Sequence, residues 1–265
     1  MTCPICAQTM RPCFSARVLN RYEARYEVCE HCGFLRAADP HWLDEAYSSA
    51  IAAADTGLVG RNKQIAQTLA SLLYFALPSR GRGRYLDTAG GYGMLTRLMR
   101  DSGFDFYWAD AHCKNLLAAG FEYRIDHGPC EAVTAIEVME HLVDPLGFVD
   151  ETLRNAQSDT LIFTTHLYQG AVPQPDAWWY YTFATGQHIG FFNLTTLQTL
   201  GQRLGLRFLS ANGIHVLSRS ALHPMRIRWS TSRRAAQLCA PWIRHRLGSK
   251  TLSDHDAILR GSSTV

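Results

Sequence analysis

A strand that runs straight into a glycine-rich turn constrains the fold of this chain more than any other feature. The segment reads YLDTAGGYG and spans Tyr85–Gly93. Glycine has no Cβ, so the backbone can turn sharply there and approach a ligand closely. A helix is expected to begin near Tyr92, with Leu95, Leu98 and Met99 facing a sheet. This strand, turn and helix predict the cofactor-binding unit of an α/β domain.

Short apolar segments alternate with helical ones after this turn, which indicates parallel βαβ units. Strands are predicted at Arg84–Asp87, Phe106–Ala109, Ala132–Ile136 and Thr160–Thr164. A helix is expected after each strand except where a loop intervenes. Around Asn212-Gly213, an antiparallel pair that closes the sheet is predicted at Leu206–Ser210 and Ile214–Ser218. The predicted fold class is therefore α/β, a Rossmann-like sheet with helices on both faces.

The chain divides into four predicted segments. A small cysteine-bearing subdomain is followed by a helical lead-in, the sheet domain and a basic extension, at residues 1–40, 41–80, 81–219 and 220–265. At 265 residues and 47% hydrophobic composition, the chain can bury one substantial core with small additions.

The basic extension is unusual in its charge. From Arg219 to Lys250 the chain has eight Arg or Lys residues and no Asp or Glu, and Pro224 and Pro241 are expected to break any long helix. The expected explanation is a solvated face. The alternative is attraction of a phosphate-bearing acceptor.

The net charge and the apolar segments of the chain limit the partners and the location that can be expected. The net charge of +3 is too small to predict a nucleic-acid partner, which usually needs a concentrated basic surface. The N-terminus has no basic segment followed by an apolar run, and the longest apolar-rich stretch, Ile65–Leu77, is too short to span a bilayer. A cytoplasmic protein without a membrane span is expected, and nothing in the sequence indicates an oligomeric state.

Two C-x-x-C pairs near the N-terminus predict a metal site. Cys3 and Cys6 form the first pair, and Cys29 and Cys32 form the second after twenty-two intervening residues. Four thiolates complete a tetrahedral zinc site with no open position, so a structural zinc ribbon is predicted. The alternative is that the cysteine pairs occur by chance or serve redox chemistry.

The residues around the glycine-rich turn indicate the cofactor. Thr96 stands where a nicotinamide-binding G-x-G-x-x-G motif has its third glycine, which weakens that interpretation. Asp87, just before the turn, favours a ligand with an amino group, and S-adenosylmethionine has one beside its sulfonium cation. Asp110 ends the next strand, twenty-three positions after Asp87, where a carboxylate can accept hydrogen bonds from both ribose hydroxyls.

A third motif, EVMEHLVDP, follows a central strand. It places Glu137 and His141 one helical turn apart at the carboxyl end of that strand, where open α/β sheets bind ligands. The alternatives are a glutamate that starts a helix and a histidine held by structural hydrogen bonds.

At these residues the chain resembles the class I S-adenosylmethionine-dependent methyltransferases, and more narrowly the branch with an E-x-x-E-H-L-x-D-P segment. The resemblance covers about residues 61–219. It implies that Asp87 and the loop Ala89–Gly93 contact the methionine part and that Asp110 holds the ribose. Ala89 stands at a position where the family has glycine, which is tolerable if its φ stays negative. The predicted cofactor-binding residues are Asp87, Ala89, Gly90, Gly91, Gly93, Asp110, Glu137 and His141.

An aromatic-rich segment at 178–192 is expected to form the acceptor pocket. It contains Gln187-His188, and we predict His188 as the general base with Gln187 orienting the acceptor; the alternative is a buried histidine satisfied by backbone. Zinc-bearing sugar C-methyltransferases are similar in placing a zinc subdomain before the Rossmann domain, where it forms part of the substrate wall. Their histidine follows Tyr-x-Glu, and only the histidine is kept here, so transfer to oxygen, nitrogen or carbon stays open.

The predicted function is methyl transfer from S-adenosylmethionine to a small-metabolite acceptor, a sugar or nucleotide-linked sugar being one such acceptor. Three alternatives stay open. They are a non-catalytic S-adenosylmethionine-binding or zinc-mediated scaffold, a nucleic-acid-modifying methyltransferase, and an oxidoreductase built on the same sheet.

Overall fold

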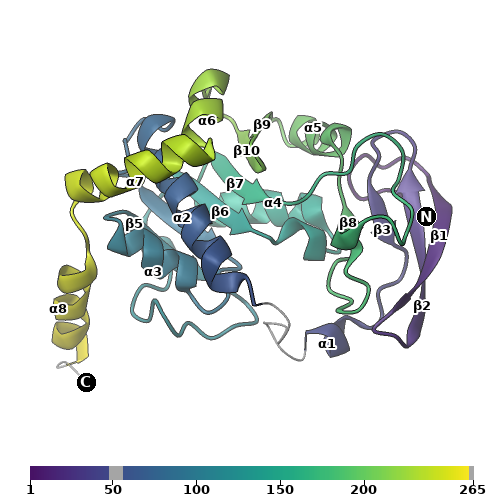
Figure 1. Cartoon of the computed structure of the whole chain (residues 1–265), viewed down its shortest axis with the longest axis horizontal. Coiled ribbons are helices and arrows are strands. Elements are labelled where there is room, and N and C mark those ends of the chain that lie inside the picture. Colours follow the sequence, from purple (N-terminus) through teal and green to yellow (C-terminus); the bar gives the residue numbers. More distant parts are fainter. Residues whose placement is uncertain (48–55, 263–265) are drawn as a thin grey trace.

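The computed structural model describes residues 1–47 and 56–262. Part of the predicted helical lead-in, residues 48–55, and the end of the basic extension, residues 263–265, therefore lie outside the described residues. The chain forms a larger mixed sheet flanked by helices and a smaller antiparallel sheet built mainly from the N-terminal region (Figure 1).

The larger sheet has six strands in the order β5-β4-β6-β7-β10-β9. Its strands are β4 (Arg84–Thr88), β5 (Asp105–Ala109), β6 (Ala132–Ile136), β7 (Thr160–Thr164), β9 (Arg207–Ala211) and β10 (Ile214–Ser218). The first four are parallel, and β10 pairs antiparallel with both β7 and β9. The predicted α/β methyltransferase-type sheet and its closing antiparallel pair are confirmed.

Helices cover both faces of this sheet (Figure 1). Side chains of α2 (Leu58–Phe75), α3 (Met94–Asp101), α6 (Pro224–Ser230) and α7 (Arg233–Leu247) share one apolar core with the sheet. Side chains of α4 (Pro145–Asn155) and α5 (Leu194–Arg203) share a second core on the opposite face. The prediction of helices on both faces is confirmed.

The connection after β5 differs from a regular βαβ unit. Within residues 110–131 the structure has no α-helix, only the 3₁₀ turn Ile125–His127 and a single parallel bridge between Trp108 and Glu122. The helix after the glycine-rich turn begins at Met94, two residues later than predicted, because Gly93 is its N-cap in a left-handed conformation.

The smaller sheet has the order β1-β2-β3-β8. Its strands are β1 (Met10–Val18), β2 (Tyr22–Cys29), β3 (Leu35–Ala37) and β8 (Gly190–Phe191), with the short helix α1 (Leu43–Ala46) close in sequence. Because β8 comes from the segment after β7, the N-terminal sheet is completed by residues more than a hundred and fifty positions away in sequence.

The basic extension folds into three helices, α6, α7 and α8 (Thr251–Ser262). Pro224 begins α6, where its missing N–H costs nothing. The predicted break at Pro241 is wrong, since α7 continues through it. An interior proline costs about 3 kcal/mol, and the burial of Ala236 and Ile243 against α2 offsets this cost.

Buried ion pairs dock α8 onto α3. Arg100 donates to both carboxylate oxygens of Asp254 at 2.8 Å, and Arg97 donates to one of them at 2.8 Å. The Arg100 guanidinium also lies 3.7 Å from the centre of the Phe121 ring. Among the helices of the described chain, none is long and apolar enough to cross a membrane.

Candidate active site and cysteine cluster

A cavity of about 500 Å³ opens at the carboxyl ends of β4 and β6, where the strand order reverses. Open α/β sheets bind their ligands at this kind of switch point. One side of the wall is formed by the start of α2 and the glycine-rich turn, and the other by the segment 179–188. The cavity therefore joins the predicted cofactor loop to the predicted acceptor segment.

Asp87 lies on the cavity wall and is only 2% exposed. Its carboxylate accepts hydrogen bonds from the Thr134 hydroxyl at 2.8 Å and the Thr96 hydroxyl at 3.4 Å. Burial raises the pKa of Asp87 to about 7, although these two hydrogen bonds lower it. A buried carboxylate of this kind can ionise when a cationic ligand arrives.

The glycine-rich turn packs too tightly for larger residues. A Cβ on Gly90 would lie 2.8 Å from Cδ1 of Trp108 and 2.9 Å from the Asp87 carboxylate. Gly93 has φ +85°, and a Cβ there would lie 2.6 Å from the Asn115 amide oxygen. Both positions therefore require glycine, as the sequence predicted for a turn that approaches a ligand.

The backbone conformation of Ala89 differs from the one expected. It was expected to keep a negative φ, but its φ is +50°, in the left-handed region. This conformation lets the next residue, Gly90, donate its N–H to the Ala109 carbonyl at 3.1 Å and so tie the turn to β5. An alanine there has a steric cost on the order of 1 kcal/mol.

The Asp110 carboxylate accepts hydrogen bonds from the backbone of the glycine-rich turn and of the chain after β5. One carboxylate oxygen accepts from the Gly91 N–H at 2.9 Å, and the other accepts from the N–H groups of His112 and Cys113 at 2.7 and 2.8 Å. Asp110 thus orders the loop that lines the cavity without lining it itself. Its contact with a ribose stays a prediction.

Glu137 and His141 do not lie one helical turn apart as predicted. Glu137 follows β6 with φ +56°, outside the 3₁₀ helix Met139–His141, and its N–H donates to the Thr164 hydroxyl. It lines the cavity and pairs with Arg61 at 3.3 Å. His141 does not line the cavity, and its Nδ1 contacts the Gln187 carbonyl at 3.1 Å and the Tyr47 hydroxyl at 2.8 Å.

His188 lines the acceptor side of the cavity. Its Nδ1 lies 2.7 Å from the Tyr180 carbonyl oxygen, which can only accept, so Nδ1 carries the proton in the neutral ring and Nε2 keeps a lone pair. Burial, together with the nearby His141, lowers the pKa of His188 to about 4. The imidazole is therefore neutral at ordinary pH.

Gln187 also lines the cavity, but its side chain has a structural contact. Its amide nitrogen donates to the Ala46 carbonyl at 2.9 Å. The neighbouring Gly186 carbonyl accepts from the Trp42 indole at 2.9 Å. The acceptor segment is thus held against the N-terminal region at Gly186 and Gln187.

Glu140 is a site residue that the sequence interpretation left without a role. It is 1% exposed, lines the cavity, and its Oε2 has no hydrogen-bond partner among the described residues. Donor atoms of Glu140, His141 and His188 lie within 4.8 Å of one another. The sequence does mark Glu140, because it is the second glutamate of the E-x-x-E-H segment. Its burial beside His188, however, depends on the fold and could not be predicted.

One carboxylate and two imidazoles can serve two kinds of chemistry. The buried charge of Glu140 can stabilise a protonated His188, and the same donor set can hold a divalent metal ion. His166 and Tyr180 also line this side of the cavity, and their rings pack at a centroid distance of 4.7 Å.

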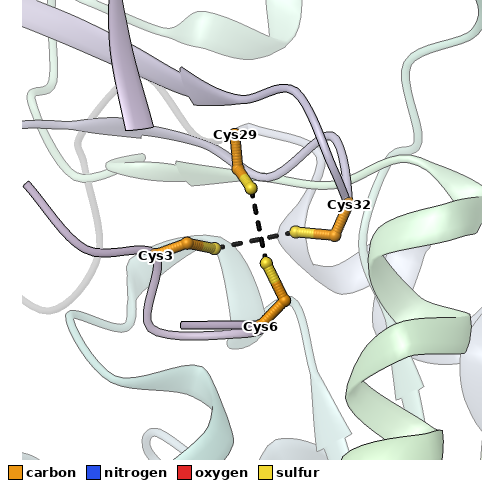
Figure 2. Close-up of side chains that lie close together, drawn as sticks. All are labelled: Cys3, Cys6, Cys29 and Cys32. Carbon is orange, nitrogen blue, oxygen red and sulfur yellow. Dashed lines mark hydrogen bonds between the residues drawn. The ribbon is translucent and has the colours of Figure 1, made fainter. Parts of the chain in front are cut away.

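The four predicted zinc ligands converge on one point (Figure 2). The Sγ atoms of Cys3, Cys6, Cys29 and Cys32 lie within 4.8 Å of one another, with Cys3 facing Cys32 at 3.6 Å and Cys6 facing Cys29 at 3.4 Å. These separations exceed a disulfide bond, and all four are free thiols. Four convergent thiolates fit a structural zinc ion.

The cysteine cluster is part of the molecule's main core. Three of its four cysteines are buried with side chains of the sheet and of α5. The Thr196 hydroxyl, in the first turn of α5, donates to the Cys32 carbonyl at 2.8 Å. From Cys32 the chain enters β3, and β3 pairs with β8, two residues after His188. The cluster is therefore connected to the acceptor wall through β3 and β8.

Comparison with known protein families matches residues 61–211 to the methyltransferase domain family, described as "Methyltransferase domain". The chain belongs to this family. The predicted class I S-adenosylmethionine-dependent methyltransferase domain is thereby confirmed, and so is the enzyme class. Among curated proteins the comparison found no match.

Solved structures with a similar fold include TnmH, at 18% identity and a TM-score of 0.48 over 69% of this methyltransferase and 62% of TnmH. An O-methyltransferase family 2 protein from Planctomyces limnophilus in complex with apigenin matches at 14% identity and a TM-score of 0.47, covering 67% and 65% of the two chains. Magnesium protoporphyrin IX methyltransferase from Synechocystis with bound S-adenosylhomocysteine matches at 12% identity and a TM-score of 0.43, covering 68% of this chain and 94% of that one. The matched region thus spans less than two thirds of the first two proteins.

Proposed function

We propose that this methyltransferase transfers the methyl group of S-adenosylmethionine to a small-molecule acceptor bound in the cavity beside the glycine-rich turn. The observation that carries the proposal is the single cavity shared by Asp87, the turn after β4 and His188. A sugar or a nucleotide-linked sugar is the acceptor class to test first. When bound, the cofactor supplies an electrophilic methyl group on a sulfonium cation.

The cofactor half of the cavity supports this assignment through charge and shape. Asp87 offers a buried carboxylate to the amino group, and the loop from Ala89 to Gly93 offers backbone at close range. Glu137 lines the same space, and Asp110 holds the loop in place; we assign the ribose hydroxyls to its carboxylate. Asp110 and His141 are the two predicted cofactor-binding residues that do not line the cavity, and the His141 ring packs against the His188 ring at a centroid distance of 4.9 Å.

The acceptor half supports proton removal by His188. Methyl transfer forms a bond from the acceptor atom to the methyl carbon and breaks the carbon–sulfur bond, and the acceptor's proton must leave. The free Nε2 of His188 takes that proton, and the buried carboxylate of Glu140 stabilises the resulting imidazolium. Gln187 orients the acceptor through its amide oxygen while Ala46 holds its amide nitrogen.

A structural zinc ion in the cysteine cluster completes the proposal. It would hold Cys3, Cys6, Cys29 and Cys32 together and so fix β3. Because β8 pairs with β3, the ion would also fix the chain that carries His188. A closed four-thiolate site leaves no position for a substrate, so we assign zinc no part in methyl transfer.

The test is a transfer assay with methyl-labelled S-adenosylmethionine and a panel of small hydroxyl and amine compounds, including sugars and nucleotide sugars. We expect label in one product class. With that acceptor, His188→Ala should lower kcat by roughly a hundredfold to ten-thousandfold while S-adenosylmethionine affinity barely changes.

His245→Ala, at an exposed position of α7, is the matched control and should leave kcat unchanged. A near-parental kcat in His188→Ala would return this histidine to a structural role. Tight cofactor binding without transfer to any compound in the panel would favour a non-catalytic binding protein.

A further inference from the structure

The helices α6 and α7 carry an exposed apolar face on the part of the chain that the active site does not use. Met225 and Trp229 of α6 are 66% and 51% exposed, and Leu238 and Trp242 of α7 are 79% and 49% exposed. Each pair is four residues apart on its helix, so its two members lie on the same side. Large side chains so exposed on adjacent helices are uncommon on a protein surface that stays in water.

Phe75, at the end of α2, joins the two pairs into one surface. Its ring packs against Trp229 at a centroid distance of 5.0 Å and against Trp242 at 6.2 Å, and Tyr74 packs against Trp242 at 5.3 Å. The two indoles are thus held in place from below by α2 while about half of each stays exposed. We call Met225, Trp229, Leu238 and Trp242 the tryptophan face.

Exposed cations lie on the same two helices as the tryptophan face. The six arginines of α6 and α7 are all exposed, and they are Arg226, Arg228, Arg233, Arg234, Arg244 and Arg246. No acidic residue occurs between Arg219 and Lys250 or within α2, the helix beneath. Charge complementarity therefore requires an anionic partner.

These arginines do not serve the cavity. Its lining residues all lie between Leu58 and His188, so no residue of α6 or α7 contributes to it. The alternative that the basic extension attracts a phosphate-bearing acceptor has no support from this geometry. The partner must then bind outside the active site.

The chemistry of the face favours a lipid surface over a nucleic acid or a protein groove. Tryptophan prefers the boundary between lipid headgroups and acyl chains, and arginine binds lipid phosphates there. Aliphatic Met225 and Leu238 gain nothing from a phosphate backbone but gain burial among acyl chains. Figure 1 shows α7 in the half of the molecule opposite the cysteine-bearing sheet.

We propose that the tryptophan face docks this methyltransferase onto the surface of a membrane that contains anionic lipids. The arginines contact headgroup phosphates, and Trp229, Trp242, Leu238 and Met225 insert at the headgroup level. No helix enters the bilayer core, and the active site stays in water. The proposal is independent of the acceptor and of the roles of His188 and the zinc site.

Vesicle co-sedimentation of the full chain tests the proposal. We expect binding to phosphatidylcholine vesicles that contain phosphatidylglycerol, weakening as salt rises, and little binding to phosphatidylcholine alone. The double variant Arg234→Gln and Arg246→Gln, one helical turn from Leu238 and Trp242, should weaken binding about thirtyfold, at about fivefold per arginine near an anionic surface. The double variant Leu238→Ser and Trp242→Gln should also weaken vesicle binding. Its effect should persist at high salt, because salt screens the charges but not the apolar contacts.

Matched controls are Leu194→Ser on α5 and Arg207→Gln on β9, which are exposed residues outside α6 and α7. They should leave vesicle binding unchanged, and all variants should keep the parental far-ultraviolet circular dichroism. Equal binding by the tryptophan-face variants, or no binding to anionic vesicles, would overturn the proposal. So would tight binding of single-stranded RNA, or self-association through this face, in place of vesicle binding.

Discussion

Asp87 connects cofactor binding to pH. Burial raises its pKa to about 7, and a cationic ligand needs the ionised form. We therefore expect the affinity for S-adenosylmethionine to rise with pH, by about tenfold between about pH 6 and pH 8, because the ionised fraction rises by that factor. Isothermal titration calorimetry across this range measures it.

Two variants sharpen the Asp87 prediction. Asp87→Asn should bind weakly and lose this pH dependence. Thr134→Val removes a hydrogen bond that lowers the pKa of Asp87, so the rise in affinity should move to higher pH. An affinity of the parental protein that does not change with pH would contradict the role of Asp87.

His188 predicts a different pH behaviour. A general base works in its neutral form, so kcat rises with pH through the pKa of the base. Burial lowers the pKa of His188 to about 4, so kcat at saturating cofactor should be flat from about pH 6 to pH 8. The rise of kcat with pH is therefore expected near pH 4 and not near the ordinary histidine pKa of about 6.5.

Glu140→Gln tests whether the buried carboxylate assists His188. Without that charge His188 becomes a weaker base, and kcat should fall by about tenfold or more. Glu137→Gln is the matched comparison, since Glu137 faces the cofactor side and should change the KM for S-adenosylmethionine instead. An unchanged kcat in Glu140→Gln would remove Glu140 from the mechanism.

At the residue scale, local chemistry in the sequence predicted some positions and missed others. The four cysteines and Asp87 were predictable because spacing and an adjacent turn report their neighbours directly. The left-handed Ala89 was not, because its φ follows from the hydrogen bond between Gly90 and the Ala109 carbonyl on another strand. Glu140 was missed because burial beside His188 arises only when distant segments meet.

We propose that the N-terminal sheet, as an element, depends on a zinc ion bound by the cysteine cluster. We expect one zinc ion per chain, and Cys29→Ser should lose it and loosen the N-terminal sheet, while the larger sheet stays folded. Elemental analysis and hydrogen exchange measure both effects. Because β8 belongs to the same sheet, exchange should also increase around β8.

Cys13→Ser is the control for the zinc prediction, since Cys13 is exposed on β1 outside the cluster. Protein purified without chelators that contains no zinc would refute the site. Two ions per chain would place the second at Glu140, His141 and His188 and would make His188 a metal ligand in place of a base.

The helix α8 is held by one buried carboxylate. Asp254→Ala removes two of the hydrogen bonds of the buried Arg100 and leaves it only Asp105 and the Phe106 carbonyl, which should destabilise the docked helix by about 1 to 3 kcal/mol. Hydrogen exchange within Thr251–Ser262 measures this effect. Asp256→Ala, at an exposed position of the same helix, should change little, and equal exchange in the two variants would contradict the ion-pair account.

The same ion pair gives the docking of α8 a pH dependence. Burial alone would raise the pKa of Asp254, but hydrogen bonds from Arg100 and Arg97 lower it below its ordinary value. The stabilisation is therefore fully present above about pH 4 and is lost as the pH falls through the folded pKa.

At the element scale, periodicity predicted the strands better than the helices. The strands β6, β7 and β10 have the predicted bounds, because short apolar runs between turns fix their ends. The irregular chain after β5 and the helix that continues through Pro241 were not predictable from local propensity. Tertiary contacts decide both, the second through the packing of α7 on α2.

At the scale of the whole molecule, the two sheets act together in building one cavity. The N-terminal sheet is completed by β8, and the backbone N–H of Ile189, next to His188, donates to the Glu140 carbonyl at 2.9 Å. The acceptor wall is thereby fixed to the cysteine cluster on one side and to the cofactor-binding sheet on the other. The sequence indicated both parts but could not show that they share these residues.

Every role assigned above to the cavity residues depends on S-adenosylmethionine binding in this cavity, which isothermal titration calorimetry of the full chain measures. We expect binding of one S-adenosylmethionine per chain, no binding of NAD, and affinity weaker by roughly a hundredfold in Asp110→Ala, which loses carboxylate hydrogen bonds at the turn. No heat of binding with S-adenosylmethionine, or parental affinity in Asp110→Ala together with binding of NAD, would contradict it.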